Sequence, residues 1–153
     1  MSEAGPEHTP MALWPEVSAL AGASETLAAL HGRYPLHIAT NATVSRKPMI
    51  QLALERAGLL QYLTEIFCFT ELGYRKDEPE FWNLVTTKLG VPAQSIAMIG
   101  DSLEQDVLAP RAFGIFSVWF NEADRPLPSG VSVPTVSRLC DFVPVVVSPP
   151  ISL

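Results

Sequence analysis

Two aspartates, Asp101 and Asp106, follow the short apolar run 96–99 and a single glycine, Gly100. An apolar run of this length is typical of a buried strand, and the glycine allows a tight turn after it. Open α/β sheets bind their ligands at the carboxyl ends of strands, and paired carboxylates suit a hard cation such as Mg2+. Acids are also favoured at the start of a helix by the helix macrodipole. The pair alone therefore indicates either a metal site or an ordinary helix start.

Other polar groups follow two further predicted strands. Thr40 and Asn41 end the apolar stretch 36–40, and Lys76 lies in the loop 71–78 after the next strand. The carboxyl ends of parallel strands share one edge of a sheet, so these groups are expected to meet the aspartates. A hydroxyl, an ammonium group and a carboxylate pair supply what phosphoryl chemistry needs: a donor to phosphate oxygen, a cation and a seat for a metal ion. The sequence thus favours a phosphate site.

Each of these residues also has a purely structural interpretation. Thr40 and Asn41 can simply form a turn, because asparagine tolerates turn backbone. Lys76 can be a solvated loop charge, and Arg75 beside it can take its place. His37 lies inside a predicted strand and is expected to be a packed histidine, not a catalyst.

The bulk composition is that of one acidic domain. The chain has 153 residues, of which 48% are hydrophobic, which suits a single packed core. A net charge of −6 and the lack of a basic stripe argue against nucleic-acid binding. The sequence has no apolar run of the roughly 18 residues that a membrane span needs, and no secretory signal pattern. Cys68 and Cys140 are expected to be small apolar residues in a reducing cytoplasm.

Strands and helices are expected to alternate along the chain. Apolar periodicity and turn residues predict strands at 36–40, 66–70, 96–99 and 115–120, and helices at 24–31, 45–57, 79–89 and from 102 onward. Ser24 is expected to cap the first helix, and Ser102 with Gln105 to form a capping box. Pro110 should kink or shorten the last helix. This alternation predicts an α/β fold with a parallel sheet and helices on both faces.

Less regular segments flank this pattern. Residues 11–23 favour a short helix after Pro15, and residues 136–142 favour another. The run 143–147 is β-prone, but Pro144 restricts it to an edge strand or a tail.

The order and spacing of these motifs resemble the haloacid dehalogenase-like (HAD) hydrolase superfamily over roughly residues 24–121. His37-Ile-Ala-Thr-Asn41 resembles the second motif of that family, and residues 73–81 resemble the third. Residues 98–106, running on to 112–114, resemble the fourth. Residues 118–121 resemble the stretch after the family's last core strand. Asp77 departs from the pattern, because the family usually has proline there. The resemblance implies a three-layer Rossmannoid fold, with a parallel sheet between two layers of helices.

The resemblance also implies roles for individual residues. Thr40 and Lys76 would be catalytic: Thr40 would hydrogen-bond the phosphoryl group, and Lys76 would neutralise the phosphate and the nucleophile. Asn41 would help to place the substrate. Asp101 would ligate Mg2+, with Asp106 bound to the ion directly or one layer further out. The implied activity is Mg2+-dependent hydrolysis of a small phosphorylated metabolite, a phosphate monoester, in the cytoplasm.

The first motif of the family is not found. It is an apolar strand ending in Asp-x-Asp, which provides the covalent nucleophile and the general acid/base. None of the five aspartates of this chain is followed two positions later by another. The sequence therefore leaves three interpretations open: a phosphatase whose nucleophile comes from elsewhere, a non-catalytic module that binds phosphate, metal or protein, and a fragment of a longer phosphatase.

The missing motif also removes a strand. In the family this strand is central, between those ending at Thr40 and Ile99, and without it both would have bare apolar edges. The two strands can pair directly, a second copy or another partner chain can donate a strand, or residues 143–147 can fill the gap. The expected organisation is a leader with the tail of a helical cap at 1–23, a HAD-like core at 24–142 and a tail or edge strand at 143–153.

Overall fold

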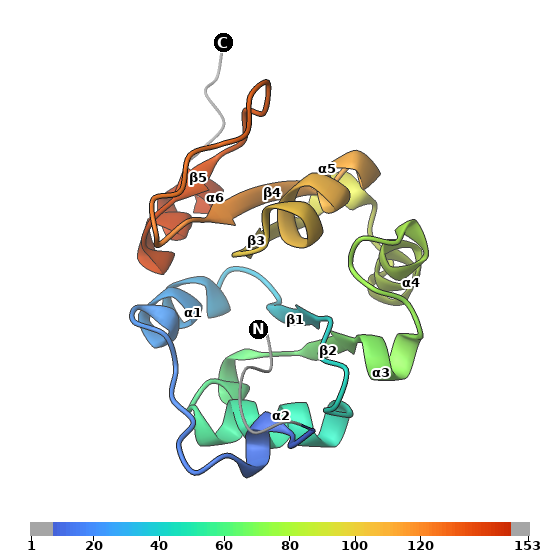
Figure 1. Ribbon diagram of the computed structural model, residues 1–153, viewed down its shortest axis with the longest axis vertical. Helices are drawn as coiled ribbons and strands as arrows, with labels where there is room; N and C mark the ends of the chain where they lie inside the picture. The colour runs from blue at the N-terminus through green and yellow to red at the C-terminus, as the bar shows by residue number, and fades with distance from the viewer. Residues whose placement is uncertain (1–7, 148–153) are drawn as a thin grey trace.

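Parallel strands and their connecting helices make up the computed structural model, which describes residues 8–147 (Figure 1). The strands are β1 (His37–Thr40), β2 (Glu65–Cys68), β3 (Ala97–Gly100), β4 (Phe116–Phe120) and β5 (Thr135–Val136). The α-helices are α1 (Ala23–His31), α2 (Lys47–Arg56), α3 (Phe69–Leu72), α4 (Pro79–Leu89), α5 (Ala109–Phe113) and α6 (Phe142–Val147). Short 3-10 turns occur at Met11–Leu13, Leu60–Tyr62, Ala93–Ser95 and Leu139–Asp141, and a π-helix at Leu103–Leu108.

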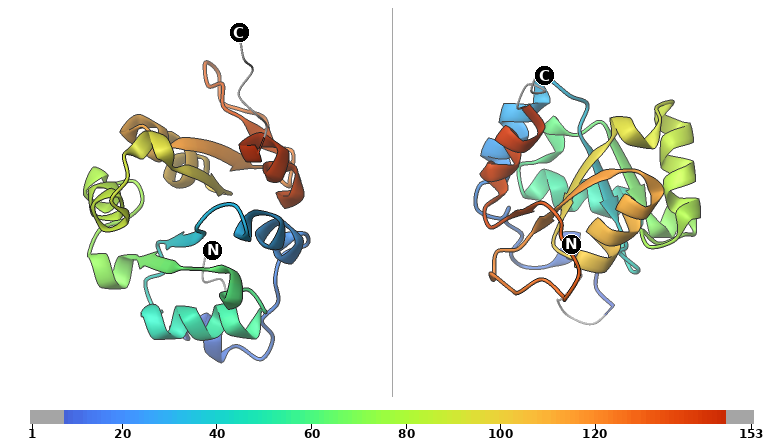
Figure 2. Two further views of the ribbon diagram at one scale, coloured as in Figure 1. Left: turned by 180° about the vertical axis from the view of Figure 1, so that it is seen from behind. Right: turned by 90° about the horizontal axis from the view of Figure 1, so that it is seen from above.

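The strands form two separate parallel sheets instead of one. In the first sheet β1 pairs with β2, from His37 opposite Glu65 to Thr40 opposite Cys68. In the second, β4 lies between β3 and β5. Strands β1 and β3 are not hydrogen-bonded to each other, although they are the facing members of the two sheets (Figures 1 and 2). Direct pairing of the two inner strands, one of the three predicted solutions, is therefore wrong.

The prediction of an edge strand at residues 143–147 is also wrong, because these residues belong to helix α6. Pro144 lies in the first turn of this helix, where proline is tolerated. Val143 and Val146 pack into a cluster built on Leu30 and Phe142. Burial of this helix face outweighs the β preference of the valines. Residues 148–153 lie outside the described residues.

The other irregular segments differ from the predictions in similar ways. Residues 14–22 form no helix after Pro15, and α1 is capped by Gly22 in the left-handed conformation (φ 80°) instead of by Ser24. Residues 136–142 hold the end of β5, a 3-10 turn and the start of α6 instead of one short helix. The remaining predicted strands and helices are confirmed to within a few residues.

Three clusters of buried side chains hold the layers together. The first joins α2 to β2 through Ile50, Leu54 and Ile66. The second spans both sheets, because Phe67 of β2 and Ile115 before β4 belong to one cluster with residues of α4, which are Phe81, Trp82 and Val85. The third contains Leu30 of α1, Val118 of β4 and Phe142 of α6. Helix packing thus connects two sheets that share no strand pairing. Among residues 8–147, every helix falls short of the length and hydropathy needed to cross a bilayer.

His37 is a packed histidine, as predicted. Its ring meets Phe67 edge to face, with the ring centroids 6.0 Å apart, and its buried Nδ1 atom has no hydrogen-bond partner. Burial lowers the pKa of His37 below its ordinary value of 6.5, and the nearby Glu65 carboxylate partly opposes this shift. The folded protein therefore favours the neutral imidazole.

The lowered pKa predicts that stability is lost on acidification. The unfolded chain binds a proton that the folded chain resists, so the free energy of unfolding should fall as the pH drops below about 6.5. Urea unfolding between pH 7.5 and 5.5 measures this dependence. The variant His37→Phe should show a flatter profile, and His31→Gln, which changes an exposed histidine, should keep the original slope. Equal slopes for wild type and His37→Phe would show that another group is responsible.

Candidate functional site

Asn41 connects the carboxyl ends of the two sheets. It follows β1 directly, and its Nδ2 atom donates a hydrogen bond to Oε1 of Gln105, in the π-helix after β3, at 2.8 Å. Its Oδ1 atom accepts a hydrogen bond from the backbone N–H of Lys76, also at 2.8 Å. The amide side chain therefore fixes the loop of Lys76 and the helix of Gln105 against the same strand end. We call this edge the rim, and define it by Asn41, Lys76, Gln105 and Asp106.

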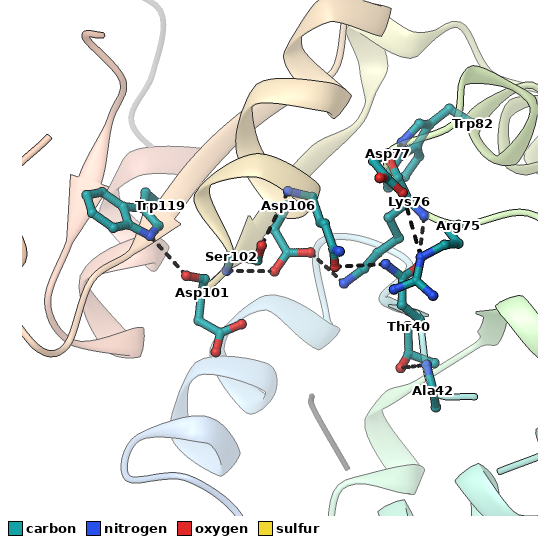
Figure 3. Close-up of polar contacts among 12 residues, drawn as sticks. Thr40, Ala42, Arg75, Lys76, Asp77, Trp82, Asp101, Ser102, Asp106 and Trp119 are labelled. Atoms are coloured by element: carbon teal, nitrogen blue, oxygen red, sulfur yellow. Dashed lines mark hydrogen bonds and ion pairs between the residues drawn. The ribbon is translucent and has the colours of Figure 1, made fainter. Parts of the chain in front are cut away.

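Lys76 and Asp106 form a buried ion pair at the rim (Figure 3). The Lys76 Nζ atom lies 2.5 Å from Oδ1 of Asp106, and only 7% and 4% of the two side chains are exposed. The second carboxylate oxygen, Oδ2, accepts the backbone N–H of Ser102 at 3.0 Å. The backbone carbonyl of Lys76 accepts the indole N–H of Trp82 at 2.7 Å. The two opposite charges thus neutralise each other, and both carboxylate oxygens have hydrogen-bond partners. The ion pair connects the α3–α4 loop to the segment after β3.

Gly100 leaves room for the Asp106 carboxylate. A Cβ atom added at Gly100 would lie 2.4 Å from the Cβ, Cγ and Oδ2 atoms of Asp106, closer than non-bonded atoms approach. The following turn is stabilised by Ser102, whose hydroxyl accepts the backbone N–H of Gln105 at 3.3 Å. Only this half of the predicted capping box is confirmed, because the Gln105 side chain binds Asn41 instead of the Ser102 backbone.

Pro110 modifies the helix without ending it. Residues Leu103–Leu108 form a π-helix, and α5 continues from Ala109 to Phe113 before Gly114 ends it in the left-handed conformation. A proline within a helix removes one backbone donor, so the wider π-turn before it is the local response. The prediction that Pro110 disturbs this helix is therefore confirmed.

Thr40 and Asp101 lie near the rim but do not join its hydrogen bonds. The buried Thr40 hydroxyl accepts the backbone N–H of Ala42 at 3.2 Å, which is a local turn contact. Asp101 is exposed, and within residues 8–147 its carboxylate has no hydrogen-bond or ion-pair partner. Figure 3 shows this carboxylate directed away from Asp106. The backbone carbonyl of Asp101 accepts the indole N–H of Trp119 at 3.0 Å.

The two acids differ in their fitness as ligands of a metal ion. The Asp101 carboxylate has free oxygens at the end of β3, as a hard cation requires. Both Asp106 oxygens are occupied, by Lys76 and by the backbone of Ser102. The described part of the chain contains no group of three or more His, Cys, Asp or Glu side chains suited to a metal ion. Mg2+ usually binds one or two carboxylates and completes its shell with water and phosphate oxygen, so Asp101 fits that role in part.

Sequence reasoning missed two contributors to the rim. Gln105 was assigned to a capping box, and the sequence contains no signal that its side chain reaches Asn41, 64 positions away. The second contributor is Trp82, a buried residue of α4 whose indole N–H also fixes the backbone carbonyl of Lys76.

Residues 7–114 match the family model described as haloacid dehalogenase-like hydrolase. The chain belongs to this family. It is 31% identical over 122 residues to the pyrimidine 5′-nucleotidase YjjG of Escherichia coli, covering 78% of this chain and 53% of that protein. It is 33% identical over 112 residues to the ribulose-1,5-bisphosphate 5-phosphatase of Halopiger xanaduensis, covering 72% and 45%.

The HAD-like fold is also found among solved structures. A HAD phosphatase from Thermococcus onnurineus superimposes with a TM-score of 0.67 at 27% identity, covering 80% of this chain and 55% of that one. The chain spans about half the length of the curated relatives that it matches. The comparisons confirm the predicted family and the partial Rossmannoid fold.

Removing either member of the Lys76–Asp106 pair should destabilise the HAD-like core. Lys76→Met or Asp106→Asn leaves the other charge buried without a partner, and each should lower the free energy of unfolding by roughly 3–5 kcal/mol. The double variant should lose much less than the sum of the two, because neither charge remains. Urea unfolding of all four proteins measures this coupling. Lys88→Met, at an exposed lysine paired with Glu65, is the control and should change stability little. Strictly additive losses would contradict the coupling.

Gly100→Ala should force the Asp106 side chain out of place. Overpacking of this kind costs roughly 1–3 kcal/mol of stability, and thermal unfolding measures it. The matched control is Gly32→Ala, because an added Cβ meets nothing within 4 Å there and φ is an ordinary −78°. That control should be neutral or slightly stabilising. If the two variants have the same Tm, the close approach between Gly100 and Asp106 does not affect stability.

Proposed function

We propose that this chain provides the phosphate-binding and metal-holding part of a HAD-like phosphohydrolase acting on a small phosphate monoester. Family membership and the phosphatase and nucleotidase names of its relatives support this class of reaction. The observation that carries the proposal is the rim itself. There Asn41 accepts the backbone N–H of Lys76, Asp106 pairs with the Lys76 ammonium, and nearby the Asp101 carboxylate has no partner within residues 8–147.

Lys76 retains the capacity to bind an anion. A lysine ammonium has three N–H donors, and the bond to Asp106 uses one of them. Its burial lowers the local dielectric, which strengthens its attraction for phosphate oxygen. The Thr40 hydroxyl accepts a backbone N–H, so its own proton is also free to donate. Thr40 and Lys76 would thus bind the phosphoryl group, and Asn41 would orient Lys76.

Asp101 would hold Mg2+, which when bound supplies positive charge to polarise the phosphoryl group. Asp106 would act mainly by positioning Lys76, because both of its carboxylate oxygens already have partners. We further propose that the protein acts in the cytoplasm on a phosphorylated metabolite.

The described residues do not account for the carboxylate nucleophile of such a reaction. The five aspartates include no Asp-x-Asp pair, and Thr40, Lys76 and Asp101 do not replace a carboxylate nucleophile. We therefore propose that the nucleophile is supplied by a polypeptide segment other than residues 8–147. The same observation favours a second candidate function, in which the chain binds phosphate, metal or protein without catalysis.

Thermal unfolding and phosphate release together test these two functions. Mg2+ with inorganic phosphate should raise Tm by several degrees at saturation, since ligand at about 100 times its Kd stabilises by roughly 2.7 kcal/mol. Asp101→Ala should lose this stabilisation. Glu104→Ala removes an exposed acid from the following turn and should keep it. Release of phosphate from a generic aryl phosphate, above the Asp101→Ala level, would show turnover by this chain alone.

Three outcomes of these two measurements are possible. Stabilisation with turnover supports a phosphatase that needs no added segment. Stabilisation without turnover supports either a missing nucleophile or the binding module. A protein that responds to neither ligand contradicts the phosphatase and leaves only a protein-binding role.

A further inference from the structure

Trp119 of β4 contacts the backbone of Asp101, the candidate ligand of the metal ion. This tryptophan is 3% exposed and is paired on both sides of its strand, with Gly100 of β3 and with Thr135 of β5. Its Nε1 atom donates a hydrogen bond to the backbone carbonyl of Asp101 at 3.0 Å (Figure 3). The central strand of the second sheet therefore holds the backbone at this point.

Arg125, in the loop after β4, contacts the same carbonyl. Its Nη2 atom donates to the backbone carbonyl of Asp101 at 3.3 Å. Its guanidinium also lies over the indole ring of Trp119, with the Cζ atom 5.4 Å from the ring centroid. A planar guanidinium stacks on an aromatic face in a way that a lysine does not reproduce. The two donors of the Asp101 carbonyl thus also contact each other.

Asn121 fixes the backbone of Arg125. Its buried side chain donates from Nδ2 to the backbone carbonyl of Arg125 at 2.8 Å, and its Oδ1 atom accepts the backbone N–H of Arg125 at 3.0 Å. The backbone N–H of Asn121 donates to the carbonyl of Val136 in β5 at 2.8 Å. One amide side chain therefore holds the loop 121–125 against the second sheet.

The peptide group between Asp101 and Ser102 is consequently held at both ends. Its carbonyl oxygen has two lone pairs, and Trp119 and Arg125 each supply a donor. Its N–H donates to Oδ2 of Asp106 at 3.0 Å. Hydrogen bonds on both sides of one peptide group polarise it and strengthen one another. The orientation of this peptide group is therefore fixed.

The backbone is thus restrained on both sides of an unpartnered carboxylate. Before Asp101, Gly100 is paired in β3, and after it the peptide group of Ser102 has these three hydrogen bonds. Within residues 8–147 the carboxylate of Asp101 has no partner, so a cation that binds it has only the side-chain torsions to order. Binding costs less free energy when the group that binds is already oriented. Such support from a rigid element is what a pre-oriented metal ligand needs.

We infer that Trp119 and Arg125 are positioning residues that orient Asp101 for Mg2+, with Asn121 holding Arg125 in place. This inference rests on the proposed function, because it takes Asp101 as a ligand of the metal ion. If the contacts served only to stabilise the loop 121–134, their loss would lower the free energy of unfolding and leave the affinity for metal unchanged.

Binding of Mn2+ to the whole chain tests the inference. Mn2+ takes the same oxygen ligands and octahedral geometry as Mg2+. The electron paramagnetic resonance signal of free Mn2+ measures how much is bound, and added Mg2+ should displace it. Trp119→Phe removes the indole donor but keeps a ring beneath Arg125. It should raise the Kd for Mn2+ about threefold to tenfold, the effect of one lost hydrogen bond.

Arg125→Lys provides a second variant that keeps the positive charge. A change in its Kd for Mn2+ therefore reports geometry and not altered repulsion between the side chain and the metal ion. The rise should be smaller, about twofold to threefold, because lysine can still donate to the carbonyl but lacks the planar stacking group.

Two matched variants control for the loss of the same groups elsewhere. Trp14→Phe removes another indole bond to a backbone carbonyl, that of Thr9 at 2.9 Å. Arg138→Lys changes an exposed arginine that binds Asp141. Both should bind Mn2+ as the wild type does. Urea unfolding without metal should show that all four variants are folded under the conditions of the titration.

The titrations separate failure of the inference from failure of the proposed function. Wild-type binding that Asp101→Ala abolishes, with an unchanged Kd for Trp119→Phe and Arg125→Lys, overturns the inference and leaves the proposed metal ligand in place. An equal rise in Kd for Trp14→Phe also overturns the inference, because the effect would then not act through Asp101. Wild-type binding that is absent, or that Asp101→Ala leaves unchanged, overturns the metal-holding function and the inference together.

Discussion

The buried contact between Lys76 and Asp106 is the interaction on which the arrangement of the two sheets depends. An ammonium and a carboxylate at 7% and 4% exposure are tolerated only because they neutralise each other. Their hydrogen bond crosses from the loop before α4 to the segment after β3, where backbone pairing between the sheets is absent. Asn41 adds a second, uncharged connection. The polar rim and the apolar cluster around α4 therefore replace the ladder of hydrogen bonds that would unite a continuous sheet.

Most of the fold follows from local signals in the sequence. Helix α4 was predicted with its observed bounds, because Pro79 suits a first helical turn and Gly90 adopts the left-handed conformation after the last one. Helix α6 was not predicted, because its valines favour strands and only contacts with distant residues, such as Leu30, stabilise the helix. The resemblance to the HAD family predicted bare inner edges on β1 and β3 with three ways to cover them, but it did not predict two separate sheets. Which solution the chain adopts depends on packing over long sequence separations, and local patterns do not contain that information.

The candidate site shows the same division between local and distant causes. The convergence of Asn41, Lys76 and Asp106 followed correctly from their places after successive parallel strands. The difference between the two aspartates, one buried and paired and the other exposed, could not be predicted, since their positions in the sequence do not distinguish them. Gly100 lets Asp106 turn inward beneath the strand end, where it meets a lysine from another loop, and Asp101 stays exposed. The roles of Thr40, Asn41 and Asp101 toward a substrate or metal ion remain predictions.

The tryptophans of the chain offer an optical consequence of this architecture. Of its three indoles, Trp82 is bonded to the carbonyl of Lys76 and Trp119 to the carbonyl of Asp101. The emission of an indole depends on its hydrogen bonding and on local electric fields. Rearrangement of either loop would therefore change the intrinsic fluorescence, and the protein contains two native spectroscopic reporters at the positions where chemistry is expected.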